Sequence, residues 1–134
     1  MNVNRKVGTA FEKDLCISLA GYGFWCHNMA QNAQGQPFDV IAARNGRAYP
    51  IDCKDCEKDV FRLSRIEENQ ASAMALWRLT GNEESWFALR LTDSSVWMLA
   101  FSRLEMLGLT KTVLSKSEIK KNGIPLREWV ERCE

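Results

Sequence analysis

The sequence lacks the features of membrane-bound, secreted and fibrous proteins. No apolar run approaches the roughly 20 residues that a membrane-spanning helix needs. The polar stretch Met1–Lys6 is followed by no apolar segment that would make a signal peptide. The sequence also has no internal repeat, no low-complexity tract and no linker between domains. We therefore expect a cytosolic protein that has no membrane partner.

The sequence also has little net charge and no cysteine pattern typical of disulfides. The formal charge is only +1 at pH 7, so any affinity for phosphate groups must come from local basic clusters. The 5 cysteines are odd in number and lack the spacing of a small disulfide-bonded domain, which indicates free thiols. Cys53 and Cys56 have the C-x-x-C spacing, but no second pair completes four zinc ligands. This favours core thiols over a zinc site.

What is present suits one compact domain. The 134 residues are 46% hydrophobic and include 5 Trp and 6 Phe, which should allow about two-thirds of the unfolded surface to be buried. Residues 1–134 are expected to form a single α/β (α+β) domain with a mixed central β-sheet flanked by helices. The expected elements are, in order, a helix from about residue 4 to 21, a strand 24–28, a hairpin 38–54, a helix 64–79 capped by Ser64 and Glu67, strands 86–91 and 96–101, and short helices from 102 and 125.

The hairpin brings charged residues together. Asn45-Gly46 is a strong turn signal between two apolar runs. Folding about it sets Asp52 opposite Asp39. Because strand side chains alternate between faces, Asp52 and Lys54 share a face. The hairpin therefore predicts a cluster of Asp39, Asp52 and Lys54.

Such a cluster has a clear chemical use. An aspartate inside an apolar strand is costly unless a cation or hydrogen-bond donors lie beside it. Two carboxylates, water and a DNA phosphate could supply the near-octahedral oxygen ligands that Mg²⁺ prefers. Lys54 could orient or deprotonate the attacking water, or stabilise charge on the phosphate. The alternative is a buried Asp–Lys ion pair that bridges two strands.

Two more polar residues lie on otherwise apolar helix faces. Gln70 lies in the apolar stripe of the helix 64–79, where an amide needs hydrogen-bond partners, and the metal site is the obvious source. Its alternative is a partly exposed position at the helix edge. Glu12 lies in the middle of the first helix if that helix starts near Asn4, but it could instead form a capping box with Thr9.

Basic residues that could contact DNA phosphates form small groups. Arg5 and Lys6 lie on the first helix, and Arg44 and Arg47 flank the hairpin turn. A solvated surface charge is the alternative for each of them. We favour Arg44 and Arg47 as the DNA contacts.

The combined pattern resembles a known nuclease superfamily. Asp39 is followed thirteen residues later by Asp52-x-Lys54, with Gly8-Thr9-Ala10-Phe11-Glu12 in the preceding helix and Asn69-Gln70 in the following one. This order is similar to that of the PD-(D/E)XK nucleases, and within them to Holliday-junction resolvases of the RecU type, including phage-borne versions. The likeness covers about residues 4 to 80.

The resemblance implies a restriction-endonuclease-like core and a role for each site residue. Asp39 and Asp52 would bind the metal, Lys54 would be the catalytic lysine, Glu12 the helix acid of the site, and Gln70 its support. The cofactor would be Mg²⁺, with Mn²⁺ as a substitute. The partner would be branched or four-way DNA, cut by a homodimer because resolution needs two symmetric cuts. The location would be the cytoplasm of a bacterial cell or of a phage-infected host.

Three departures from the family pattern are visible. Phe38 separates Pro37 from Asp39, Asp52 stands where glutamate is commoner, and there is no room for the long stalk insertion of RecU proteins. Two other functions stay open at this point. One is a nuclease of the same fold that acts on ends, nicks or foreign DNA, and the other is a non-catalytic DNA-binding protein. The intact Asp39, Asp52 and Lys54 argue against the latter.

Overall fold

The structure, a computed structural model, describes residues 3–29 and 37–133, and side chains from residue 10 onwards. The elements of this part of the chain are, in order, α1 (Val3–Gly21), β1 (Trp25–Asn28), β2 (Val40–Arg44), β3 (Arg47–Asp55), β4 (Phe61–Arg62), the 3₁₀ turn η1 (Leu63–Arg65), α2 (Glu68–Leu79), β5 (Trp86–Arg90), β6 (Val96–Ala100), α3 (Phe101–Leu107), β7 (Val113–Leu114), α4 (Lys116–Asn122), β8 (Ile124–Pro125) and α5 (Leu126–Arg132).

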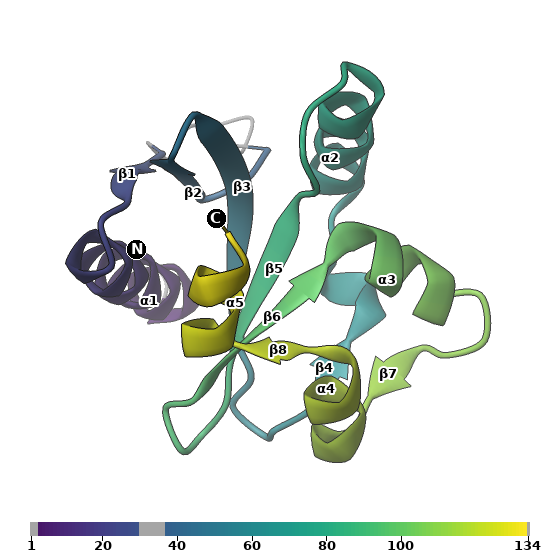
Figure 1. Ribbon diagram of the computed structural model, residues 1–134. Coiled ribbons are helices and arrows are strands. Elements are labelled where there is room, and N and C mark those ends of the chain that lie inside the picture. Colours follow the sequence, from purple (N-terminus) through teal and green to yellow (C-terminus); the bar gives the residue numbers. More distant parts are fainter. Residues whose placement is uncertain (1–2, 30–36, 134) are drawn as a thin grey trace.

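A mixed sheet of six strands forms the centre of the fold (Figure 1). The strand order is β1-β2-β3-β5-β6-β8, in which β3 and β5 are parallel and all other neighbours are antiparallel. The short strands β4 and β7 pair separately. This architecture confirms the predicted α+β class with helices around a mixed sheet.

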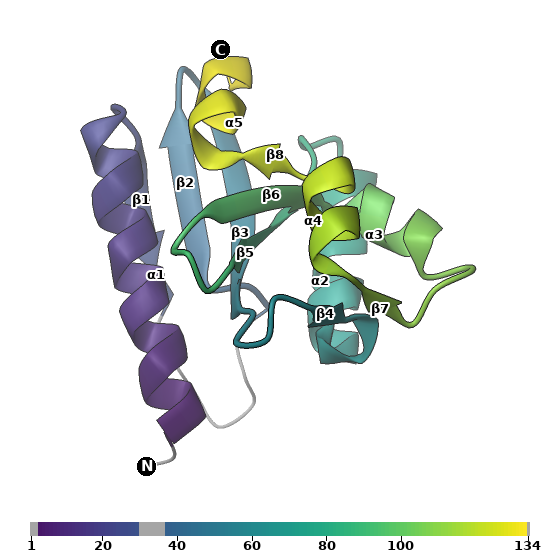
Figure 2. The same ribbon diagram turned by 90° about the horizontal axis from the view of Figure 1, so that it is seen from below.

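Two hydrophobic cores lie on opposite faces of this sheet. On one face, α1 and α5 pack against the sheet through Phe11, Leu15 and Trp129. On the other face, helices α2, α3 and α4 and the small β4–β7 sheet pack on β5 and β6, with Met74 and Phe87 at the centre. Figure 2 shows α1 on one side of the sheet and α2 to α4 on the other. The central strands β3 and β5 are therefore mostly buried on both faces, whereas the edge strand β1 is largely exposed.

The first helix is held by a stripe of apolar side chains. Phe11, Leu15 and Leu19 recur every four residues, share one face of α1 and are almost completely buried. The helix ends at Gly21, and Gly23 follows with a φ of +87°. Because this glycine turns the chain sharply, β1 runs back along the helix.

The hairpin β2–β3 has the predicted register. Asn45 and Gly46 have φ values of 56° and 79°, the left-handed pair that a tight two-residue hairpin turn requires. Arg44 therefore pairs with Arg47, and Val40 pairs with Ile51 at the far end. One step further on stand Asp39 and Asp52.

The start of α2 differs from the prediction. Residues 63–65 form the separate turn η1, and α2 begins at Glu68, with Glu67 as its N-cap. The backbone N–H of Glu67 donates to the Gln70 side chain at 3.1 Å. The predicted Ser64–Glu67 capping box is therefore wrong. The structure has a capping box of Glu67 and Gln70 instead. Because residues 63–65 form η1, Ser64 lies outside α2 and cannot cap it.

Two further predictions concern membranes and thiols. No helix within the described residues is long and apolar enough to cross a membrane. All of the cysteines are free, and Cys53, Cys56 and Cys133 are buried. They are core thiols, as expected from their number and spacing.

Candidate active site

Asp39 joins the two strands of the hairpin at the end opposite the turn. Its backbone N–H donates to the carbonyl of Ile51 at 3.1 Å, and its Oδ2 accepts from the backbone N–H of Cys53 at 2.8 Å. These two bonds lie on either side of Asp52 along β3. They hold the Asp39 carboxylate beside Asp52, and the side chain is only 7% exposed.

Asp52 is the most deeply buried charged residue of the site, with no exposed surface. Its Oδ1 accepts a hydrogen bond from Gln70 Nε2 at 2.9 Å. Its Oδ2 lies 3.2 Å from Lys54 Nζ, close enough for an ion pair. Both oxygens of this buried carboxylate therefore face a polar group, the amide of Gln70 on one side and the ammonium of Lys54 on the other.

Gln70 connects α2 to this part of β3. Its amide nitrogen donates to Asp52, and its Oε1 lies 3.4 Å from Lys54 Nζ and accepts from the backbone of Glu67. The side chain is buried. Gln70 thus orients both Asp52 and Lys54, and the alternative of an exposed position at the helix edge is wrong.

Glu12 reaches the site from α1, on the other face of the sheet. Because α1 begins at Val3, Glu12 lies inside the helix, and a capping box with Thr9 is excluded. The side chain is 5% exposed. Burial raises the pKa of Glu12 to about 8, and the charge of Asp39 and a hydrogen bond with it act in the same direction. Glu12 therefore holds a proton at neutral pH.

Burial also governs the pKa of Asp52. It raises this pKa well above the usual value, the negative charge of Asp39 raises it further, and Lys54 acts against both. The protein thus keeps two carboxyl groups close together in a place where neither is well solvated. An additional cation is the simplest group that would allow both to ionise.

The structure thus brings the five predicted site residues into one cluster. Asp39, Asp52 and Lys54 come from the hairpin, Glu12 from α1 and Gln70 from α2. The ion pair between Asp52 and Lys54 lies within one strand, and a purely structural Asp–Lys pair stays the alternative to a catalytic role. Within the described part of the chain, no three or more His, Cys, Asp or Glu side chains are grouped as in an all-protein metal site, so a metal at Asp39 and Asp52 would take its other ligands from water and substrate phosphate.

The predicted DNA contacts lie elsewhere. The guanidinium of Arg44 stacks on Phe24 with its carbon 4.3 Å from the ring centroid, and it donates to three backbone carbonyls, two of them near the end of α5. Arg47 lies 3.7 Å from Glu83. Both residues flank the turn, at the hairpin end away from Asp39. Arg5 and Lys6 are in the first turns of α1, but their side chains fall outside the described part.

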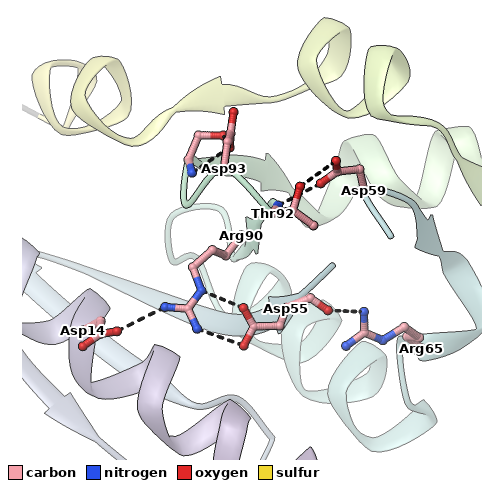
Figure 3. Close-up of polar contacts among 8 residues, drawn as sticks. Asp14, Asp55, Asp59, Arg65, Arg90, Thr92 and Asp93 are labelled. Carbon is pink, nitrogen blue, oxygen red and sulfur yellow. Dashed lines mark hydrogen bonds and ion pairs between the residues drawn. The ribbon is translucent and has the colours of Figure 1, made fainter. Parts of the chain in front are cut away.

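One polar cluster beside the site was not predicted. Arg90, at the end of β5, contacts Asp55 of β3 and Asp14 of α1 (Figure 3). These three residues are far apart in the sequence and match no motif. Only the parallel register, which pairs Asp55 with Arg90, could have indicated the contact.

Comparisons with known proteins identify the family and the fold. The family described as "Archaeal holliday junction resolvase (hjc)" matches residues 2–134. No curated protein matches the sequence. Among solved structures, the fold is similar to the 1.6 Å structure of Archaeoglobus fulgidus Hjc, a Holliday junction resolvase from an archaeal hyperthermophile, with a TM-score of 0.69, 23% identity, and coverage of 92% of this chain and 95% of that one.

The family assignment refines the expectation from the sequence. The matching family is Hjc, and the finer RecU-type likeness is not confirmed. Resolvases bind branched DNA, act as dimers and in general depend on a divalent metal. The chain therefore belongs to the archaeal Holliday junction resolvase family, and it is a nuclease that hydrolyses phosphodiester bonds at four-way DNA junctions.

Proposed function

We propose that this resolvase cuts DNA at the cluster of Glu12, Asp39, Asp52, Lys54 and Gln70, and that Asp39 and Asp52 hold Mg²⁺ there. The observation that carries the proposal is the buried Oδ2 of Asp52. It is fully buried and lies 3.2 Å from Lys54 Nζ, and the negative charge of the neighbouring Asp39 adds to the cost of ionising Asp52. Two buried carboxylates side by side are costly unless a bound cation offsets their charge.

The donor set suits a hard cation. Mg²⁺ is commonly held by one or two carboxylates, with water and substrate phosphate completing an octahedron. Asp39 and Asp52 supply those two carboxylates, and no further protein ligand is needed. When bound, the ion would stabilise charge on the phosphate and make an attached water more acidic. Mn²⁺, which also favours oxygen ligands, should substitute.

Lys54 supplies the positively charged side chain of the proposed site. Its side chain is 13% exposed, so the ammonium lies at the boundary between the core and solvent, where DNA would bind. From there Nζ can orient the attacking water and stabilise the charge that develops on the scissile phosphate. Gln70 keeps Asp52 and Lys54 in place, because it binds both side chains.

The charge of the Glu12 carboxyl group should depend on whether a metal is bound. In the metal-free protein its pKa of about 8 keeps it protonated, which avoids a third negative charge beside Asp39 and Asp52. A cation between the two aspartates would favour ionised Glu12. We assign to Glu12 the support of Asp39, with which it shares a hydrogen bond.

Several features of the wider protein belong to the same proposal. Residues 1–134 act as a single nuclease domain in the cytoplasm. Arg47, Arg5 and Lys6 contact DNA phosphates, whereas the guanidinium of Arg44 serves the fold through its backbone contacts. A phage or bacterial host and a RecU-type subfamily stay predictions from the sequence, with no support from the comparisons.

The test removes charge from the site without changing its shape. Asp39→Asn and Asp52→Asn should abolish cleavage of a labelled four-way junction in Mg²⁺ while junction binding survives. The assay compares junction, duplex and single-stranded DNA on one gel. Ca²⁺ should support binding but little or no cleavage, because its coordination is larger and looser. Cleavage by either variant at the normal rate would remove that residue from the site.

A further inference from the structure

Arg90 and Asp55 form a two-point contact at the ends of two parallel strands. Arg90 Nε donates to one carboxylate oxygen of Asp55 at 2.6 Å, and Nη2 donates to the other at 3.1 Å (Figure 3). Such a bidentate pair fixes direction as well as distance. Asp55 follows Lys54 directly, so the contact lies at the end of the strand segment that carries Asp52 and Lys54.

The same guanidinium also holds α1. Its Nη1 donates to Asp14 at 3.1 Å, and its central carbon lies 4.4 Å from the ring centroid of Phe11. Phe11 and Asp14 flank Glu12 along the helix. Arg90 therefore joins the part of α1 that carries Glu12 to the part of β3 that carries Asp52 and Lys54.

A third segment meets this group. The carbonyl of Asp55 accepts a hydrogen bond from Arg65 Nη1 at 2.8 Å, and Arg65 ends the turn that leads into α2. Gln70 lies in the first turns of that helix. We call the group of Arg90, Asp14 and Asp55 the Arg90 cluster. Its hydrogen bonds connect α1, β3 and the turn before α2.

Apolar packing alone would not fix the position of α1 along β3. Leu15 and Leu19 hold α1 at its distance from the sheet, but such contacts are non-directional and resist sliding along the sheet only weakly. Directional hydrogen bonds between a planar guanidinium and two carboxylates set the register of the helix. The position of Glu12 relative to Asp39 depends on that register.

We propose that Arg90 is a positioning residue for DNA cleavage, which acts by fixing the register of α1 over β3 and so the placement of Glu12 against the aspartates. This inference rests on the proposed site. A direct contact of Arg90 with DNA phosphate fits less well. Three of its five N–H groups already donate to carboxylates, and one Arg with two Asp gives the cluster a net negative charge.

The test separates the two arms of the cluster. Asp14→Ala removes the hydrogen bond of Arg90 to α1 and leaves its contacts with Asp55 and Phe11, and because the Asp14 side chain is 66% exposed, the fold should tolerate the change. Arg90→Lys keeps the charge but loses the two-point contact. Glu128→Ala is the matched control, because it removes a similar exposed pair, Glu128 with Arg132 at 2.7 Å on α5, away from the site.

Single-turnover cleavage of the junction is measured at saturating Mg²⁺, and the dissociation constant of the junction is measured in Ca²⁺. Altered support of active-site ligands commonly costs about 10–100-fold. We expect a rate loss of about tenfold for Asp14→Ala and a larger loss for Arg90→Lys, with dissociation constants within about twofold of the wild type. The double variant should be no slower than Arg90→Lys alone, because the two residues act as a unit. Glu128→Ala should cleave at the normal rate.

Three results would overturn the inference. These are a normal rate in Asp14→Ala, a rate loss matched by an equal loss of junction affinity, and strictly additive effects in the double variant. The Asp52→Asn variant distinguishes this failure from that of the site itself. If Asp52→Asn is inactive while Asp14→Ala cleaves normally, only the role of Arg90 is wrong. If Asp52→Asn cleaves, the proposed site is wrong.

Discussion

At the scale of single residues, the site combines groups that are unfavourable on their own. Asp52 has no exposed surface, and its carboxylate is held by Gln70 at one oxygen and by Lys54 at the other. Lys54 offsets part of the cost of the buried charge, but the neighbouring Asp39 adds to it. Such an arrangement is expected where a bound cation offsets the remaining cost, because natural proteins otherwise pair their buried charges.

The importance of Lys54 can be measured directly. We expect Lys54→Ala to lower the single-turnover rate by about a hundredfold or more, as for a group that acts on the attacking water or on the charge of the transition state. Junction affinity in Ca²⁺ should change little. A rate near that of the wild type would indicate that Lys54 only pairs with Asp52 to stabilise β3.

The protonation of Glu12 predicts how stability depends on pH without metal. Its pKa rises from 4.5 in the unfolded chain to about 8 in the folded protein. Between these values the folded protein binds a proton that the unfolded chain has lost, so the free energy of unfolding falls as pH rises. The raised pKa of Asp52 acts in the same direction.

Thermal unfolding in EDTA between pH 5 and 8 checks this sign. The melting temperature of the wild type should fall with pH more steeply than that of Glu12→Gln, whose side chain stays neutral. Added Mg²⁺ should reduce the fall, because it stabilises the ionised carboxylates. Equal slopes for the two proteins would show that Glu12 does not carry the extra proton.

At the scale of elements, the β2–β3 hairpin was the most predictable part of the fold. Its turn requires positive φ at both central residues, and Asn-Gly meets that need better than almost any other pair. Because the turn fixes the register, it also fixed which carboxylates face each other. The start of α2 was predicted wrongly, since Ser64–Glu67 and Glu67–Gln70 are both plausible caps, and the structure uses the second.

The shortest elements left little trace in the sequence, whereas α1, β1, β5 and β6 lie close to their predicted bounds. Strands β7 and β8 have two residues each, too few for any alternation of apolar and polar side chains. The Arg90 cluster joins residues that are 35 and 76 positions apart, and such contacts depend on how the elements pack. The proposed catalytic cluster could be predicted because its residues follow a spaced pattern, whereas the Arg90 cluster could not.

The turn itself allows a test at this scale. Gly46 has a φ of +79°, and a Cβ there would meet no atom within 4 Å, so Gly46→Ala would introduce backbone strain but no clash. We expect a loss of about 1–2 kcal/mol in the free energy of unfolding.

Gly21→Ala is the control, because Gly21 ends a helix, lies outside the positive-φ region and also has open space. Its stability should be unchanged or slightly higher. Urea unfolding of both variants measures the difference, and equal stabilities would mean that the turn is not under this constraint.

At the scale of the whole molecule, the site draws on both layers of the fold. Glu12 comes from the helix layer on one face of the sheet, Gln70 from the layer on the other face, Asp52 from β3 and Asp39 from the residue before β2. A substitution that shifts a helix in either layer should therefore also shift the side chains around the carboxylates. The small net charge of +1 means that DNA must be held by local groups and by the geometry of the assembly more than by a broad basic field.

Resolution of a four-way junction requires paired cuts, and this leads to a prediction about the assembly. Two symmetric cuts need two active sites related by a two-fold axis, so the protein should be a dimer at working concentrations. It should cleave a junction in preference to a duplex of equal length. Weakening of binding by salt is not diagnostic, since any phosphate-binding protein shares it.

Mixed dimers test the pairing of the two sites. A dimer that combines one wild-type subunit with one Asp52→Asn subunit keeps the binding surface for the junction but has a single working site. It should nick one strand of the junction and release few linear duplex products, whereas the wild-type dimer should cut both strands at symmetric positions. Denaturing and native gels of the same reaction separate nicking from resolution. A monomer that cuts linear duplex as readily as a junction, or a mixed dimer that resolves junctions at the normal rate, would contradict action by two paired sites.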